Sequence, residues 1–97
     1  MATFISLLKY TQKGAENIKQ VPARIEAARK AAKAVGADIK QIYLVMGRYD
    51  VVVVSEGPDD ESAARLALAT AMQGNVQSET LRAFTEPEFK KILAALP

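Results

Sequence analysis

The polar side chains that could do chemistry in this sequence gather at two places. The first is the stretch Gly47-Arg48-Tyr49-Asp50, where a phenol and a carboxylate follow a glycine and an arginine. The second is the pair Thr80 and Arg82, two positions apart. A guanidinium can hold a small anion through two parallel hydrogen bonds, and a carboxylate can act as a base. These residues are therefore candidate ligand contacts, and Tyr10 and Tyr43 are further aromatic hydroxyls that could join them.

Each of these groups also has a structural interpretation that needs no ligand. Gly47 suits a turn with positive φ. Asp50 can cap that turn or pair with Arg48 or Arg82. Arg82 can instead form an ion pair at an interface, with Asp50 or Glu79 as its partner. A tyrosine usually packs its ring against apolar neighbours and hydrogen-bonds its hydroxyl at the tip. The sequence leaves both interpretations open.

Composition excludes several kinds of chemistry. The chain has no cysteine and no histidine, which removes disulfides, thiolate nucleophiles and the usual imidazole base or metal ligand. The run Asp59-Asp60-Glu61 could bind a hard cation, but acids are favoured at a helix N-terminus without one. No Gly-rich phosphate loop or nucleophile elbow is present. We therefore expect neither a cofactor nor a metal ion.

The net charge of +2 is unevenly distributed along the 97 residues. Residues 1–40 carry eight Lys and Arg against three acids, and residues 41–97 carry five against eight. No aromatic residues interleave the basic run, so we interpret it as a solvated helix face and not a nucleic-acid surface. The apolar start lacks the basic n-region of a signal peptide, and no stretch approaches the ~20 apolar residues of a membrane span. We expect a cytoplasmic protein that binds neither nucleic acid nor membrane.

The elements that would position these residues belong to one domain, residues 1–97. Apolar and β-branched runs predict strands, and apolar residues at steps of three and four predict helices. Strands are expected at residues 3–10, 38–46, 49–55 and 76–84, and main helices at 22–35 and 60–73, with a final helix after a capping box at Thr85. Two split βαβ units with right-handed crossovers place both main helices on one face of an antiparallel sheet. The sequence thus predicts an α+β, ferredoxin-like βαββαβ fold with an added C-terminal helix.

The predicted strands are too apolar for a sheet with one wet face. Val51-Val52-Val53-Val54 is apolar on both faces, and so is Ile42-Tyr43-Leu44-Val45-Met46. A face of this kind exposes several hundred Å² of apolar surface, the size at which a patch usually marks an interface. We expect the sheet to pack on the sheet of a second copy. A monomer whose own amphipathic C-terminal helix shields that face is the alternative.

Four linked segments resemble those of the GYD-domain family. They are Ile42-Tyr43-Leu44-Val45-Met46-Gly47-Arg48-Tyr49-Asp50-Val51-Val52, then Glu56-Gly57-Pro58-Asp59-Asp60, Gly74-Asn75-Val76 and Glu79-Thr80-Leu81-Arg82-Ala83-Phe84. The match runs in order over nearly the whole chain. The resemblance implies a dimeric α/β barrel, in which two sheets pack face to face, but it implies no particular reaction. Gly57 is a minor departure, at a position where the family pattern favours alanine.

Three classes of function fit these observations. The first prediction is a self-associating module that binds a small molecule or a partner protein at or near the barrel interior. The alternative is a cofactor-independent enzyme that acts on a small organic substrate, with Tyr49, Asp50 and Arg82 as its working groups. A purely structural subunit of a larger assembly is the third.

Overall fold

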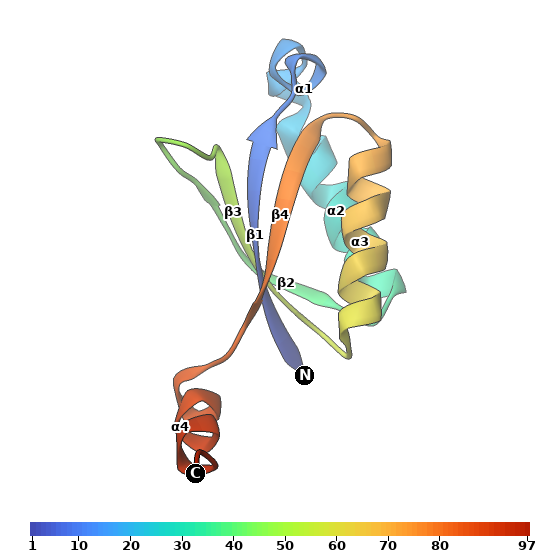
Figure 1. Ribbon diagram of the computed structural model, residues 1–97. Coiled ribbons are helices and arrows are strands. Elements are labelled where there is room, and N and C mark those ends of the chain that lie inside the picture. Colours follow the sequence, from blue (N-terminus) through green and yellow to red (C-terminus); the bar gives the residue numbers. More distant parts are fainter.

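The computed structural model describes all 97 residues and arranges them as a sheet with two helices on one side (Figure 1). The elements are, in chain order, β1 (Ala2–Tyr10), α1 (Gln12–Glu16), the 3-10 helix η1 (Ile18–Gln20), α2 (Val21–Ala34), β2 (Asp38–Leu44), β3 (Val51–Gly57), α3 (Asp60–Met72), β4 (Val76–Ala83) and α4 (Glu86–Ala94). The strands form one antiparallel sheet in the order β2-β3-β1-β4. Both βαβ crossovers place their helices, α2 and α3, on the same face. The predicted α+β fold is confirmed.

The chain between β1 and α2 is helical, although the sequence predicts no helix or strand at residues 11–21. It forms α1 and η1, because the Thr11 side chain caps α1 by accepting a hydrogen bond from the Gly14 amide at 3.1 Å. The same hydroxyl donates to the carbonyl oxygen of Gly74 at 2.6 Å, and the Thr11 amide donates to Asn75 at 3.1 Å. The short helix is therefore docked on the turn that precedes β4.

The connection between β2 and β3 is a wider loop than the predicted tight turn. The amide of Val45 donates to the carbonyl oxygen of Asp50 at 2.9 Å, which closes the loop one step beyond the last paired residues. Gly47 has a φ of +122°, a conformation that side-chain-bearing residues rarely adopt. The predicted positive φ at this glycine is confirmed, although the strands end earlier and begin later than expected.

The later helices begin at caps that the sequence signals correctly. The carboxylate of Asp59 accepts a hydrogen bond from the Ser62 amide at 2.8 Å, and this bond lowers the pKa of Asp59. Thr85 and Glu88 form the predicted capping box: the Thr85 amide donates to Glu88 at 2.9 Å, and the Glu88 amide donates to Thr85 Oγ1 at 3.4 Å. The Thr85 amide lowers the pKa of Glu88 in turn. Both caps favour the ionised acid because a carboxylate accepts from a backbone N–H.

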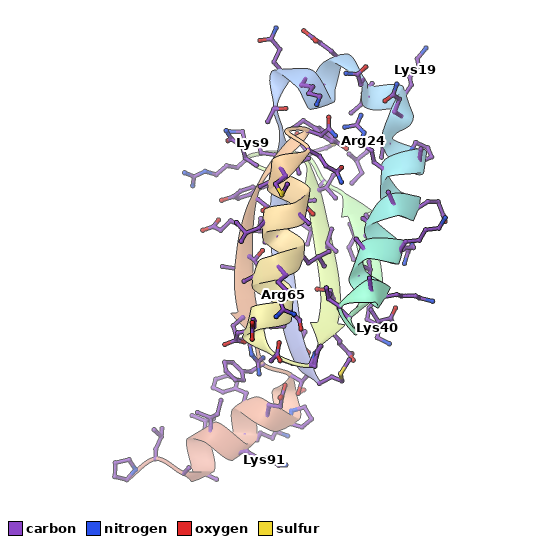
Figure 2. The ribbon with its side chains drawn as sticks, turned by 90° about the vertical axis from the view of Figure 1, so that its right-hand side faces the viewer. Lys9, Lys19, Arg24, Lys40, Arg65 and Lys91 are labelled. Atoms are coloured by element: carbon purple, nitrogen blue, oxygen red, sulfur yellow. The ribbon has the colours of Figure 1, made fainter.

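Helix α4 lies away from the rest of the chain in both views (Figures 1 and 2). Its large apolar residues are exposed, from 44% for Ile92 to 56% for Phe89. The chain therefore does not fold its C-terminal helix over the open side of its own sheet. No helix combines the length and the apolar character needed to cross a bilayer.

The core is small for the mass of the chain. Its buried apolar residues are Phe4, Ala32, Ala37 and Ile39. The accessible surface is 6784 Å², whereas a compact 10.5 kDa monomer exposes about 5,400 Å². The radius of gyration is 14.6 Å, against about 12.5 Å for a compact domain of this length. The single chain thus leaves a large area of surface available for contact with another molecule.

Candidate functional site

The side of the sheet opposite α2 and α3 carries a continuous apolar patch. Side chains alternate along a strand, and Phe4 of β1 is buried on the helix side. Its neighbours Ile5 and Leu7 therefore occupy the opposite side, next to their register partners on β3 and β4. We call this patch the open face, and it consists of Ile5, Leu7, Tyr43, Val52, Val54 and Leu81. No helix of the chain covers it (Figure 1).

Tyr49 lies at the margin of the open face. Its hydroxyl donates a hydrogen bond to Glu79 Oε2 at 2.7 Å. Glu79 pairs with Leu7 in the β1–β4 register, so the loop reaches across β1 to contact β4. The carboxylate raises the pKa of the Tyr49 phenol, because its hydrogen bond favours the protonated form. Tyr43 is 49% exposed on the same side of the sheet, and Arg48 is exposed on the loop.

Asp50 fastens this loop to the end of β1. Its Oδ2 atom accepts a hydrogen bond from the Tyr10 amide at 2.9 Å, and its own amide donates to the carbonyl oxygen of Leu8 at 2.8 Å. Of the two structural roles that the sequence allowed for Asp50, the ion pair with Arg48 or Arg82 is absent within the chain. The backbone of β1 supplies its hydrogen-bond partners instead. Asp50 thus acts as a capping residue of the loop, which is one of the two interpretations that the sequence left open.

Arg82 lies on the helix side of the sheet. Its guanidinium carbon is 4.3 Å from the ring centre of Phe84 and 5.6 Å from that of Phe4. Its Nε atom is 3.9 Å from Asp60 Oδ1, at the start of α3. Within the chain Arg82 therefore pairs with neither Asp50 nor Glu79, because strand alternation turns it toward α3; the predicted ion pair across an interface stays a prediction.

The groups proposed for enzymatic work do not converge in this chain. Arg82 pairs with Phe4 in the β1–β4 register, whereas Asp50 is bonded to Leu8 and Tyr10 farther along β1. Four to six residues of strand correspond to roughly 13–20 Å. The positions of Arg82 and Asp50 along β1 are thus farther apart than the length of a small substrate.

Two cavities lie between the sheet and the helices. The smaller, of about 100 Å³, is lined by Thr80 and by three serines, and Thr80 Oγ1 is 3.3 Å from Ser6 Oγ. The larger, of about 490 Å³, is lined by residues of α2, α3 and the sheet and includes Tyr10. Thr80 and Tyr10 therefore line cavities on the helix side, not the space above the open face.

Arg24 lines the larger cavity, although it was not among the predicted site residues. Its Nε and Nη1 atoms are buried without a hydrogen-bond partner. A signal for it exists in the sequence, because Arg24 falls three residues after Val21 and four before Ala28, within the apolar face of α2. A basic residue at such a position is either long enough to reach solvent or part of a polar site.

Comparison with known proteins identifies the family. The model of the family described as "GYD domain" matches residues 4–93. A protein of Thermus thermophilus, named "Glutamine synthetase and cystathionine beta-lyase binding protein", is 38% identical over 84 residues, which cover 86% of this chain and 88% of that protein.

Solved structures show the same fold at lower identity. TTHA0845 of Thermus thermophilus is 23% identical with a TM-score of 0.55, covering 88% of this chain and 95% of its own. The hypothetical protein PHS023 of Pyrococcus horikoshii is 21% identical with a TM-score of 0.55, covering 89% and 93%. FFRP-DM1 is 17% identical with a TM-score of 0.60, covering 87% and 100%. Sequence and fold agree, and the chain belongs to the GYD-domain family.

Proposed function

We propose that this chain is a self-associating protein-binding module, in which the open face packs on the open face of a second copy. The observation that supports the proposal is the apolar side of the sheet that the chain's own helices leave uncovered. The chain exposes about 1,400 Å² more than a compact monomer of its mass. A stable interface commonly covers ~800 Å² on each partner. The excess is therefore large enough for such an interface and for a further contact.

The charge distribution of the open face suits a second copy. Its centre is Leu7, Val52 and Val54, which carry no charge, and the acids Glu56 and Glu79 lie at its margin. Two identical neutral centres can pack at ~10 Å between sheets without burying like charges. In such a dimeric α/β barrel, Tyr43, Arg48, Tyr49 and Asp50 would surround the mouth of the barrel. These residues are our candidates for ligand contacts there.

The name of the Thermus relative supports a protein partner for the assembled module. That relative is named for binding glutamine synthetase and cystathionine β-lyase, and its match covers most of both chains. We propose that this chain also binds an enzyme, and glutamine synthetase is the first partner to test. The exposed apolar side of α4 offers a contact surface for it that does not compete with the open face.

The test compares two acidic substitutions on the same side of the sheet. Val52→Glu places a charge at the centre of the open face, whereas Gln77→Glu places the same charge at its margin, beside Lys9 in the register. Light scattering gives the mass, and biolayer interferometry measures binding to purified glutamine synthetase of the same organism. We expect wild type and Gln77→Glu to exceed 10.5 kDa and Val52→Glu to dissociate or unfold.

Each half of the proposal has its own contradicting result. A Val52→Glu protein with the wild-type mass would show that copies do not meet at the open face. A wild-type assembly that binds neither glutamine synthetase nor cystathionine β-lyase would contradict the proposed partner class and leave self-association standing.

A further inference from the structure

We propose that the larger cavity binds an amphiphilic carboxylate, with the carboxylate held by Arg24 and the apolar chain in the body of the cavity. The cavity lies between α2, α3 and the sheet, on the side away from the open face. Binding there does not require self-association. It adds a small-molecule site to the protein-binding module described above.

The cavity has the size and lining of a small-molecule site. Its volume is about 490 Å³, within the ~300–1,000 Å³ typical of ligand pockets. Fifteen of its nineteen lining residues are hydrophobic, among them Ile25, Ile42 and Val53. An apolar chain in this space would replace water against aliphatic side chains, which is favourable.

The polar groups of the cavity lie toward one end. Arg24 is in the first turn of α2, Gln73 follows the end of α3, and Asn75 directly precedes β4. Figure 2 shows Arg24 between α2 and α3 at this end of the fold, pointing inward, whereas Lys19 projects outward. The cavity is thus apolar along its body and cationic at one end.

The guanidinium of Arg24 has donors that the protein leaves unused. Its Nη2 atom donates to the carbonyl oxygen of Asn17 and, at 3.4 Å, to that of Gly14. Its Nε and Nη1 atoms are buried without a partner, and no carboxylate of the chain forms an ion pair with it. A buried charge without a counter-ion is costly, and a carboxylate can accept two hydrogen bonds from one guanidinium. Both unpartnered atoms are shielded from the cavity as the side chain lies, so a bound carboxylate would satisfy these donors after the guanidinium turns toward the cavity.

Both parts of the ligand are needed to match the site. A small anion such as acetate would pair with Arg24 but leave the aliphatic body of the cavity unfilled. A neutral alcohol of the same length would fill the body but leave the buried guanidinium without a counter-ion. An unbranched fatty acid of medium length combines the two properties.

Isothermal titration of the wild-type protein with three probes tests this matching. Octanoate carries both features, 1-octanol carries only the chain, and acetate carries only the charge. We expect octanoate to bind at least about tenfold more tightly than either other probe, as expected for one charge-assisted hydrogen-bond pair. Equal affinity for octanoate and 1-octanol, or no binding of octanoate, would overturn the proposal.

Two variants then locate the site. Arg24→Gln removes the buried charge, and Lys30→Gln removes an exposed charge from the same helix. Octanoate should bind Arg24→Gln at least about tenfold more weakly and Lys30→Gln as it binds wild type. Unchanged binding to folded Arg24→Gln would refute the assignment. If Arg24→Gln does not fold, the three-probe comparison on wild type decides alone.

The mass of the protein, measured in the same samples, separates this proposal from self-association. A monomer that binds octanoate would contradict only the open-face interface. An assembly that does not bind octanoate would contradict only the proposed Arg24 site.

Discussion

Replacing Gly14 by alanine should destabilise the fold, although the residue lies in a helix. Gly14 has no positive φ, so local propensity alone predicts that alanine would stabilise α1 by up to ~1 kcal/mol. Tertiary contact opposes this. A Cβ atom at position 14 would overlap the carbonyl oxygen of Asn75 and lie 3.0 Å from its carbonyl carbon. The neighbour is backbone, so no side-chain rotation can relieve the overlap.

The loss of stability in Gly14→Ala can be derived from the shift that the new Cβ atom imposes on the turn before β4. Restoring an ordinary contact of about 3.5 Å requires the turn before β4 to shift by on the order of 1 Å. That shift strains two hydrogen bonds from Thr11, to Asn75 at 3.1 Å and to Gly74 at 2.6 Å. Each is worth ~1 kcal/mol, and overpacking adds ~1–3 kcal/mol. After subtraction of the ~1 kcal/mol that alanine contributes to helix propensity, the free energy of unfolding should fall by about 2–4 kcal/mol.

Urea unfolding followed by circular dichroism measures this loss. Protein concentration must be the same for all variants, since the proposed self-association would make stability depend on concentration. Gly57→Ala is the matched control, because its Cβ would meet Ala37 Cβ at 3.6 Å and Phe4 Cε2 at 3.9 Å, both ordinary contacts. We expect this variant to equal wild type or gain up to ~1 kcal/mol. A Gly14→Ala protein as stable as Gly57→Ala would refute the reasoning.

Three further predictions concern side chains described above. The pKa of Tyr49 should lie above its ordinary value of 10.0. The hydrogen bond to Glu79 should therefore stabilise the fold fully below pH 10.0, and this stabilisation should be lost as the pH rises through the raised pKa. Glu79→Gln should lower the pKa of Tyr49 in an ultraviolet titration. Arg82→Gln should lose about 1 kcal/mol through its aromatic contacts, measured by urea unfolding, without changing octanoate affinity. Thr85→Ala should lose about 1 kcal/mol of α4 helix stability, seen as faster amide exchange there, whereas unchanged exchange would contradict the role of the cap.

Most of the fold could be predicted because its signals are local. The four-valine run of β3 and the apolar spacing of α2 identify their elements without knowledge of neighbours. Asp59 and Thr85 cap helices through atoms only three residues away. Antiparallel pairing and right-handed crossovers then fix the sheet order.

The candidate site was less predictable because its contacts join distant segments. The short helix α1 exists where a turn was expected because Thr11 and Gly14 dock on the turn at Asn75. Arg82 could be assigned to a face of β4 from the sequence, but its approach to Asp60 depends on where α3 begins over the sheet.

The burial of Arg24 depends on three elements at once. Its guanidinium donates to Gly14 of α1, the residue itself belongs to α2, and Gln73 at the end of α3 lines the same cavity. Its Nε and Nη1 atoms are buried, and no local pattern specifies that arrangement. Only the position of a basic residue within an apolar helical face hinted at it. Long-range packing, not local propensity, determines where this chain places its charges.

Self-association through the uncovered side of the sheet is tested most directly by the mass of the wild-type protein in solution. Sedimentation equilibrium over a range of concentrations should give at least twice 10.5 kDa. Removing the apolar open face from water lowers the free energy and so favours association. A single folded species of 10.5 kDa at every concentration would contradict the account.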